Sequence, residues 1–99
     1  MAAPVRQAPL QYSDGVRFGQ LIAQRRRELK LSQRVLADRL CAASGRATFT
    51  RHELSRYERG VRLPSGWVLA AMANCLDVPL AVLENEVTKQ RNWARQQTS

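Results

Sequence analysis

The segment 50–60 constrains the fold of this 99-residue chain more than any other part of it. Thr50 is a favourable N-cap, and Glu53 is at the position from which a capping box bonds back to the N-cap backbone N–H. Gly60 can take the left-handed conformation without steric cost, as the residue after a helix often must. The spacing therefore predicts a short helix over 51–59 with a defined start and a defined end.

The two faces of this predicted helix differ in chemistry. Leu54 and Tyr57 are three residues apart and can pack inward, and Leu54 also completes a hydrophobic staple with Phe49. The residues left for solvent or for a ligand are polar or basic: Arg51, His52, Ser55, Arg56 and Arg59. Taken alone, the segment fits an ordinary solvated helix and a helix that binds a polyanion equally well.

Charge is unevenly distributed along the chain, and this favours a polyanionic partner. The net charge is +8, and residues 15–62 hold twelve Lys and Arg against four Asp and Glu. Residues 63–88 hold three acidic residues and no basic ones, whereas residues 89–99 hold three basic residues and no acidic ones. The basic half is therefore expected to face the polyanion. Arginine outnumbers lysine fourteen to two, which suits phosphate and guanine recognition but equally fits the codon usage of a GC-rich genome.

Other classes of protein are disfavoured. The longest apolar run, 67–73, is too short to span a membrane and no signal-peptide pattern is present, so we expect a cytoplasmic protein with no membrane partner. Cys41 and Cys75 are 34 residues apart and the chain has one histidine, so both cysteines are interpreted as apolar fillers and no metal site is expected. Since no nucleophile–base pair and no Gly-rich phosphate loop is recognisable, we expect neither an enzyme nor a cofactor.

The length suits one domain, and hydrophobic periodicity predicts an all-α fold. Residues 1–13 carry two prolines and no periodicity, which indicates a mobile arm before a domain over 14–84 and an extension over 85–99. Five helices are predicted, beginning at about Asp14, after Ser32, after Thr50, after Ser65 and at Pro79. The last of these is expected to run to about Trp93.

Separated motifs along residues 18–83 together resemble one known family. They comprise Gly19, Ile22, Arg26, Leu31-Ser32-Gln33, Leu36-Ala37, the run from Ser55 to Gly60, Pro64-Ser65, Ala73, Leu76 and Leu83. In this order and at this spacing they resemble the Xre-type helix-turn-helix family of phage Cro and CI repressors. The resemblance implies a bacterial or phage transcriptional regulator that binds double-stranded DNA, and we expect it to be a homodimer. It also implies that the helix opened by Thr50 is the recognition helix, which lies in the major groove.

Matching the family's motif residue by residue implies roles on DNA. Arg51, His52 and Arg56 match base-reading positions, and arginine can bond guanine O6 and N7 with two hydrogen bonds. Gln33 matches the family's phosphate-binding glutamine, and it stands at a helix N-terminus, where free N–H groups attract phosphate. Other phosphate contacts are expected from Arg34, Arg46, Ser55, Arg59 and Arg62. For each of these arginines the alternative is a solvated surface charge.

A structural ion pair is also implied. Arg26 and Glu58 match the positions at which the family pairs an arginine of the first helix with a glutamate after the third. Removing one member of such a pair leaves the other charge buried without a partner. We therefore assign Arg26 to stability and not to DNA contact.

The sequence departs from the family pattern before the recognition helix. Thr50 follows Leu40 by ten positions, where the family has a spacing of about three, so residues 41–49 contain an insertion. We expect the second helix to run an extra turn to Ser44 before the chain loops out, which leaves the orientation of the recognition helix open. Asp77 replaces the glycine common after the fourth helix, a smaller change because aspartate tolerates the left-handed region better than most residues.

The C-terminal segment suggests a partner. Leu80, Leu83 and Val87 form a narrow apolar stripe, and Leu80 and Leu83 match family positions that pack on the core. Val87 and Trp93 are then predicted to contact a partner chain, because aromatic anchors dominate interfaces. Two alternatives stay open: an antitoxin-like module whose C-terminal segment binds a partner protein, and a DNA-binding protein without sequence preference.

Overall fold

The computed structural model describes residues 17–45, 49–64 and 66–98, so the predicted arm over 1–13 and Arg46 lie outside the described residues. The described part contains five helices and no strand, which confirms the all-α prediction. These are α1 (Arg17–Glu28), α2 (Gln33–Ser44), α3 (Arg51–Glu58), α4 (Gly66–Leu76) and α5 (Leu80–Thr98). None of the helices in these ranges is long and apolar enough to cross a membrane.

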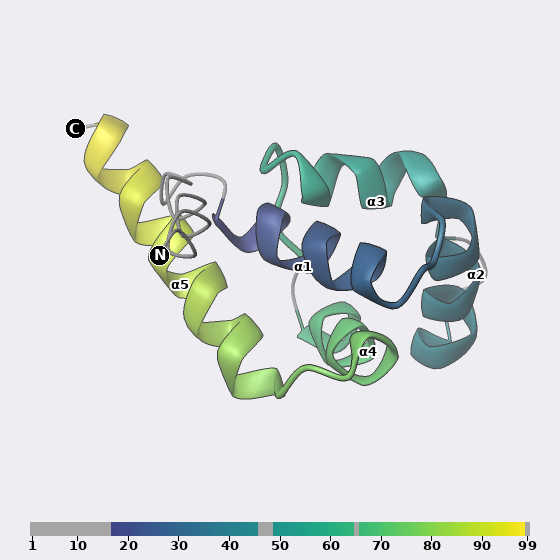
Figure 1. Cartoon of the computed structure of the whole chain (residues 1–99). Coiled ribbons are helices and arrows are strands. Elements are labelled where there is room, and N and C mark those ends of the chain that lie inside the picture. Colours follow the sequence, from purple (N-terminus) through teal and green to yellow (C-terminus); the bar gives the residue numbers. More distant parts are fainter. Residues whose placement is uncertain (1–16, 46–48, 65, 99) are drawn as a thin grey trace, which may run out of the picture.

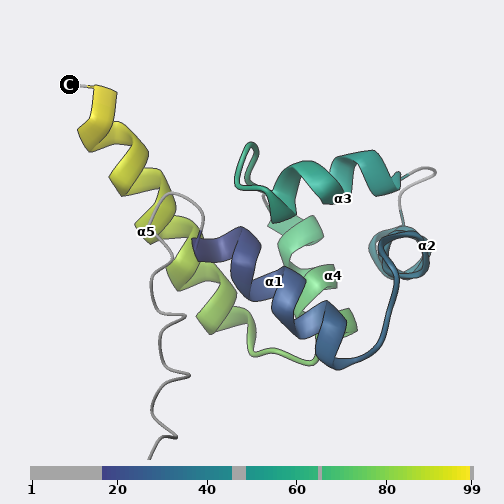
Figure 2. The same cartoon turned by 45° about the horizontal axis from the view of Figure 1, so that its top comes forward.

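Helix α1 lies at the centre of the fold. It contacts α3 on one side and α4 on the other, while α5 packs against its N-terminal end (Figure 1). Helix α2 contacts both α3 and α4, and Figure 2 shows it nearly end-on beside the start of α3. The outer side of α3 is therefore left uncovered by the other helices.

The core draws on every helix. Its fully buried members are Phe18, Ile22, Leu36, Leu40, Leu54, Met72, Leu76 and Leu83. Leu36, Ala37 and Leu40 make the inner face of α2, whereas Val35 beside them is 40% exposed. Cys41 and Cys75 are free thiols packed at the edge of the core. Burial raises the pKa of the Cys75 thiol, and the positive charge of Arg39 offsets part of this rise. The raised pKa keeps the thiol neutral, as expected of an apolar filler.

The predicted extra turn of α2 is present. Ser32 caps the helix by accepting a hydrogen bond from the backbone N–H of Val35 at 3.1 Å. The helix continues to Ser44 and ends at Gly45, whose φ of 75° lies in the left-handed region. Part of the insertion therefore lengthens α2.

Two helices end on left-handed residues other than glycine. Lys30, after α1, has a φ of 60°, and Asp77, after α4, has a φ of 55°. At both ends the following residue donates to a carbonyl one turn back, with Leu31 N bonded to Arg26 O at 3.1 Å and Val78 N to Ala73 O at 3.0 Å. These are Schellman-type ends, which satisfy carbonyls that the helix leaves free. The expected tolerance of Asp77 for this conformation is confirmed.

The C-terminal segment differs from the prediction at three points: the end of the last helix, Val87 and Leu80. Helix α5 runs past Trp93 to Thr98 without a break, so the predicted boundary between residues 84 and 85 falls inside a helix. Val87, which we assigned to a partner contact, is buried in the chain's own core with 5% of its surface exposed. Conversely, Leu80 was expected to pack on the core and is 38% exposed. The stripe that packs inward starts at Leu83 because α5 meets the core only from its second turn.

Helices α1 and α3 approach each other more closely than side chains would normally allow. A Cβ on Gly19 would lie 2.3 Å from the carbonyl oxygen of Glu58 and 2.5 Å from that of Tyr57. Real Cβ atoms do not approach backbone oxygens so closely, and backbone cannot swing aside as a side chain does. Glycine at this position therefore sets the distance between α1 and the end of α3.

A buried ion pair fixes the same two helices. The Arg26 guanidinium donates from Nε to Glu58 Oε2 at 2.7 Å and from Nη2 to Glu58 Oε1 at 3.1 Å. Its remaining nitrogen, Nη1, donates to the carbonyl of Leu31 at 2.9 Å. The two side chains are only 12% and 6% exposed. The geometry is bidentate and well satisfied, as a buried charge pair requires, and it agrees with the structural role assigned to Arg26.

We predict that Gly19→Ala destabilises the fold. In an unhindered helix the change from glycine to alanine stabilises by about 1 kcal/mol, so a net loss reports the close contact with α3. Overpacking of this kind costs about 1–3 kcal/mol. Urea unfolding of the variant, with Gln24→Ala at an exposed position of α1 as the control, measures this loss. A variant as stable as the wild type would mean that the two backbones are not in contact.

We also predict that Arg26→Ala lowers the free energy of unfolding by about 3–5 kcal/mol, because Glu58 is left buried without its counter-charge. Arg27→Ala, at the exposed neighbouring position, is the matched control and should change stability little. Thermal or urea unfolding checks both variants. Normal stability combined with lost DNA binding in Arg26→Ala would instead assign Arg26 to the DNA contact.

Candidate nucleic-acid interface

Helix α3 is rigidly defined at both ends. At its start, Thr50 Oγ1 accepts a hydrogen bond from the backbone N–H of Glu53 at 3.2 Å, as the predicted cap requires. At its end, Gly60 has a φ of 78°, and its N–H donates to the Tyr57 carbonyl at 3.1 Å. The N–H of Val61 donates to the Arg56 carbonyl at 3.0 Å, which completes a Schellman motif. The eight-residue helix therefore begins at the predicted residue, Arg51, and ends at Glu58, one residue before the predicted end.

The inner side of α3 is anchored in the core. Leu54 is fully buried, and Phe49 and Tyr57 are each 4% exposed, so the predicted staple residues Phe49 and Leu54 share one cluster. The rings of Phe49 and Tyr57 lie 6.1 Å apart between centroids. The Tyr57 hydroxyl donates to Glu53 Oε2 at 3.2 Å, so the acidic residue of the predicted capping box also holds the aromatic ring in place.

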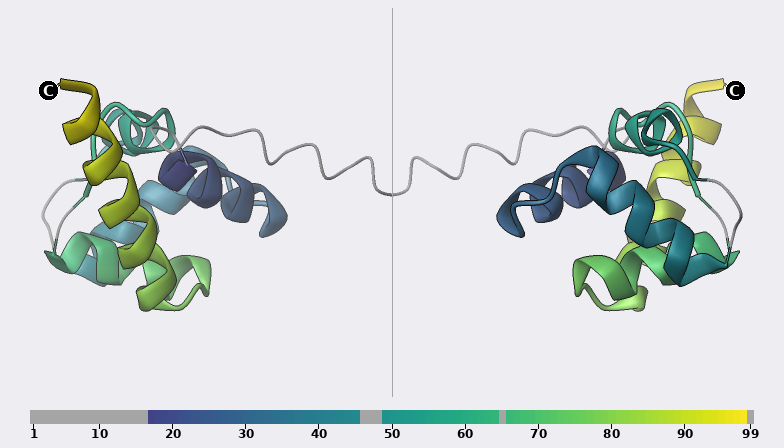
Figure 3. Two further views of the ribbon diagram at one scale, coloured as in Figure 1. Left: turned by 90° about the vertical axis from the view of Figure 1, so that its left-hand side faces the viewer. Right: turned by 90° about the vertical axis from the view of Figure 1, so that its right-hand side faces the viewer.

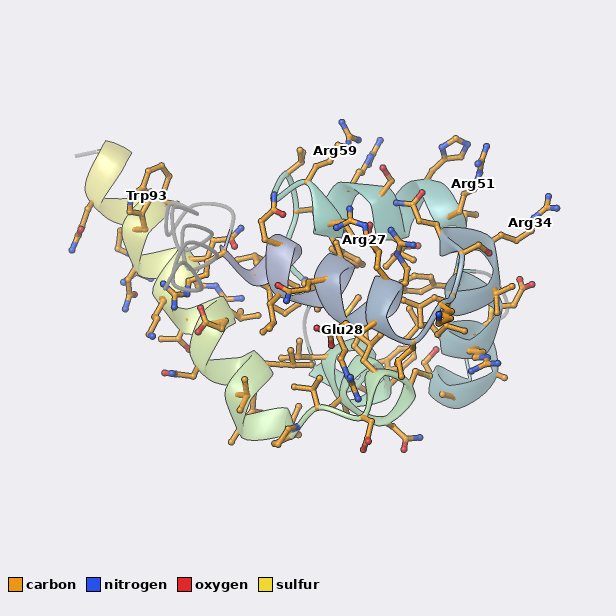
Figure 4. All side chains as sticks on the ribbon, in the orientation of Figure 1. Arg27, Glu28, Arg34, Arg51, Arg59 and Trp93 are labelled. Atoms are coloured by element: carbon orange, nitrogen blue, oxygen red, sulfur yellow. The ribbon has the colours of Figure 1, made fainter. Side chains whose placement is uncertain are left out.

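The outer side of α3 carries the predicted base-reading residues. Arg51, His52 and Arg56 are all exposed, and Ser55 beside them is half-buried. Arg59 and Arg62 are exposed just beyond the helix. Figure 4 shows Arg51 and Arg59 projecting from the outer side of α3, with Arg34 projecting from the start of α2 on the same side of the molecule. Apart from Gln33, the described residues predicted to contact DNA thus gather on one face, which we call the α3 face: Arg34, Arg51, His52, Ser55, Arg56, Arg59 and Arg62.

Two shallow hollows shape the α3 face. One lies between α2 and the start of α3, and its polar lining includes Arg34, Asp38, Arg51 and His52. The other runs beside α3 and is lined by Thr50, His52, Glu53, Arg56 and Arg62. Exposed arginines line both hollows. The α3 face is therefore corrugated and basic, a form that suits the edges of a nucleic-acid groove.

Gln33 has a contact that the sequence did not predict. Its side-chain Nε2 donates to Glu58 Oε1 at 3.0 Å, so it joins the Arg26–Glu58 pair. This hydrogen bond ties the N-terminus of α2 to the end of α3. The predicted phosphate contact of Gln33 remains a prediction, and the helix N-terminus to which Gln33 belongs still offers backbone N–H groups to an anion.

Gln90 is a structural residue that the sequence analysis missed. It is 4% exposed, its Oε1 accepts from the backbone N–H of Phe18 at 3.3 Å, and its Nε2 donates to the Gly60 carbonyl at 3.4 Å. A polar side chain buried at this level needs such partners. The sequence feature that could have identified Gln90 as buried is its spacing, because it follows Val87 by three residues and so continues the inward-facing stripe of Leu83 and Val87. Through it, α5 holds the start of α1 and the turn after α3.

Helix α1 carries three consecutive arginines, Arg25 to Arg27, and the first of them is directed away from the α3 face. Arg25 donates from Nε to the Leu76 carbonyl at 2.8 Å and from Nη1 to Glu28 at 3.1 Å, which places it over the end of α4. Within the described ranges, no group of three or more His, Cys, Asp or Glu is placed to hold a metal ion. The chemistry concentrated in the described residues is therefore that of guanidinium groups on the α3 face.

Comparisons with known proteins agree with this geometry. A family model described as a helix-turn-helix domain matches residues 17–85. The crystal structure of the restriction-modification controller protein C.AhdI from Aeromonas hydrophila is similar, with a TM-score of 0.55 and 32% sequence identity over 73% of this chain and 98% of that chain. The comparison with curated protein sequences gives no match. The chain belongs to the helix-turn-helix family, of the Xre type, and is a DNA-binding transcriptional regulator.

Proposed function

We propose that the protein recognises a specific double-stranded DNA site by placing α3 in the major groove. The observation that carries this proposal is the α3 face itself, where a helix capped at both ends and anchored by Leu54 and Tyr57 presents exposed Arg51, His52 and Arg56. The rigid position of α3 matters because a side chain can make two hydrogen bonds to one base edge only if its orientation is fixed. In this proposal Arg51 and Arg56 each read a guanine, and His52 contacts a neighbouring base.

The flanking residues are proposed to hold the DNA backbone. Phosphate contacts position a protein on the duplex without reading sequence. We assign them to residues that border α3 or stand at the start of α2: Gln33, Arg34, Arg46, Ser55, Arg59 and Arg62. Arg46 belongs to this set on sequence grounds alone. For Gln33, the backbone N–H groups at the start of α2 are the proposed donors, since its side-chain amide is bonded to Glu58.

We further propose that the protein acts as a homodimer on a two-fold operator, in the cytoplasm of a bacterial or phage-infected cell, without a cofactor or catalytic activity. The similarity to a restriction-modification controller protein supports a regulatory role. Dimerisation aligns two recognition helices with half-sites about one helical turn apart. The antitoxin-like and sequence-neutral alternatives differ from this proposal in measurable ways, through a second protein in the complex or through the absence of base preference.

We predict that Arg51→Ala and Arg56→Ala each weaken binding to the preferred site by about 1–3 kcal/mol and relax selection at one base pair, as expected for loss of a bidentate guanine contact. Arg59→Ala and Arg62→Ala are the matched comparison. They should weaken binding on every sequence and reduce the slope of log affinity against log salt by about 0.9 per phosphate lost.

Site selection from random duplexes, followed by binding titrations at several salt concentrations, separates the two groups of variants. Arg39→Ala, at an exposed position of α2 near Cys75, serves as the control for removing a positive charge. If Arg51→Ala and Arg56→Ala keep the wild-type base preference and lose affinity equally on all sequences, they are phosphate contacts and the proposed reading is wrong.

The homodimer makes a separate prediction about spacing. Adding about five base pairs between the half-sites turns one half-site to the opposite side of the duplex, since a helical turn holds about 10–10.5 base pairs. Binding to this site should fall to that of a single half-site. Molar-mass measurement of the complex, on the natural and the lengthened spacing, tests the prediction. Equal binding to both spacings would show that two chains do not engage the DNA as one unit.

A further inference from the structure

The C-terminal part of α5, residues 86–98, lies outside the matched family domain, and we call it the α5 tail. The family model ends at residue 85, whereas α5 continues as one helix to Thr98. Val87 and Gln90 fix the base of the tail to the domain by burial and by hydrogen bonds. The tail is therefore an addition to the family's domain with a defined direction relative to α3.

The α5 tail is basic. It carries Lys89, Arg91 and Arg95, and no acidic residue follows Glu86 in the sequence. Glu86 is already paired, since its carboxylate lies 3.2 Å from Arg17 Nε and 3.7 Å from Lys89 Nζ. The tail therefore adds positive charge to a chain that is already basic.

The tail extends along one side of the domain to the level of the α3 face. In Figures 1 and 3 it rises past the start of α1 until its end is level with the outer side of α3. Trp93 and Ala94 line a hollow together with the turn that follows α3, from Gly60 to Leu63. Arg62 is the one charged residue in that lining, and Trp93 is 37% exposed. The hollow, which we call the tail hollow, thus adjoins the end of α3 where phosphate contacts are proposed.

We propose that the α5 tail is a second DNA contact, in which the tail hollow receives a backbone phosphate flanking the bases read by α3. The indole N–H of Trp93 and the guanidinium of Arg62 are donors without acceptor capacity, which matches a phosphate oxygen. Arg91, which lines a separate hollow with Leu69 and Glu84 on the α4 side of the tail, and Arg95 add longer-range attraction for the DNA. The Gln90 hydrogen bond to the Gly60 carbonyl keeps the two walls of the hollow together before DNA arrives.

The charges favour DNA over a protein partner at this surface. The centres of protein interfaces are depleted in charged residues, whereas the tail hollow contains Arg62 and the tail carries three cations. A second copy docked tail to tail would bring two such sets of like charges together, at a cost in free energy. The same charges attract the phosphates of a DNA backbone, and the tail hollow adjoins the end of the α3 face.

The proposal rests on α3 lying in the major groove, and it is tested with two variants of the full chain. Arg91→Gln/Arg95→Gln removes charge at exposed positions, and Trp93→Ala removes the indole. Arg39→Gln and Trp67→Ala, an exposed tryptophan on α4, are the matched controls. Binding is measured against salt, together with hydroxyl-radical footprints on a long duplex and the base preference from site selection.

The double arginine variant should lower the salt slope by about 0.9 per phosphate lost. Both tail variants should shorten the footprint at its outer edge and leave the base preference and the molar mass unchanged, while the controls behave as wild type. An unchanged slope and footprint would overturn the proposal, and so would a fall in molar mass, which would make the tail a protein interface. Failure of the α3 assignment is distinguishable, because it appears as an unaltered base preference in Arg51→Ala and not in the tail variants.

Discussion

The contact between α1 and α3 is the constraint on which the rest of this structure depends. Gly19 lets the backbone of α1 meet the carbonyls of Tyr57 and Glu58, at a distance that no side chain would allow. The Arg26–Glu58 pair then fixes the rotation and register of the two helices. With the inner side of α3 held in this way, its opposite side is the uncovered basic α3 face.

Two sets of buried hydrogen bonds, one at Glu58 and one at Gln90, extend this constraint to the neighbouring elements. Glu58 accepts hydrogen bonds from Arg26 and from Gln33, so the end of α3 and the start of α2 share a single carboxylate. Gln90 connects α5 and the start of α1 to the turn after α3. A buried pair adds little net stability compared with good apolar packing, but it penalises any arrangement that breaks it. We therefore regard these hydrogen bonds as a device that fixes geometry, which base recognition requires.

The sequence predicted the features that depend on local chemistry. The caps Ser32, Thr50 and Gly60 and the extra turn to Ser44 each follow from a few neighbouring residues, and the structure has them in place. The Arg26–Glu58 pair could be predicted because the family motif pairs an arginine and a glutamate at these positions. In the candidate site, the exposure of Arg51, His52 and Arg56 on one side of α3 followed from helical spacing.

The features that depend on how helices meet were beyond the sequence. Val87 lies in the core and Val35 at the surface because the crossing of neighbouring helices decides which part of an apolar stripe is covered. Gln33 and Gln90 each bond to a group more than twenty residues away, and no local pattern reveals such a partner. The extension of the α5 tail to the level of the α3 face likewise follows from the angle at which α5 packs on α1.

Methylation interference tests most directly whether α3 reads the major groove. Dimethyl sulfate marks guanine at N7, in the major groove, and adenine at N3, in the minor groove. If Arg51 and Arg56 bond guanine as proposed, N7 methylation of specific guanines in each half-site should block binding, and each alanine variant should lose sensitivity at one of them. Interference confined to adenine N3, or none at guanine N7, would contradict the account.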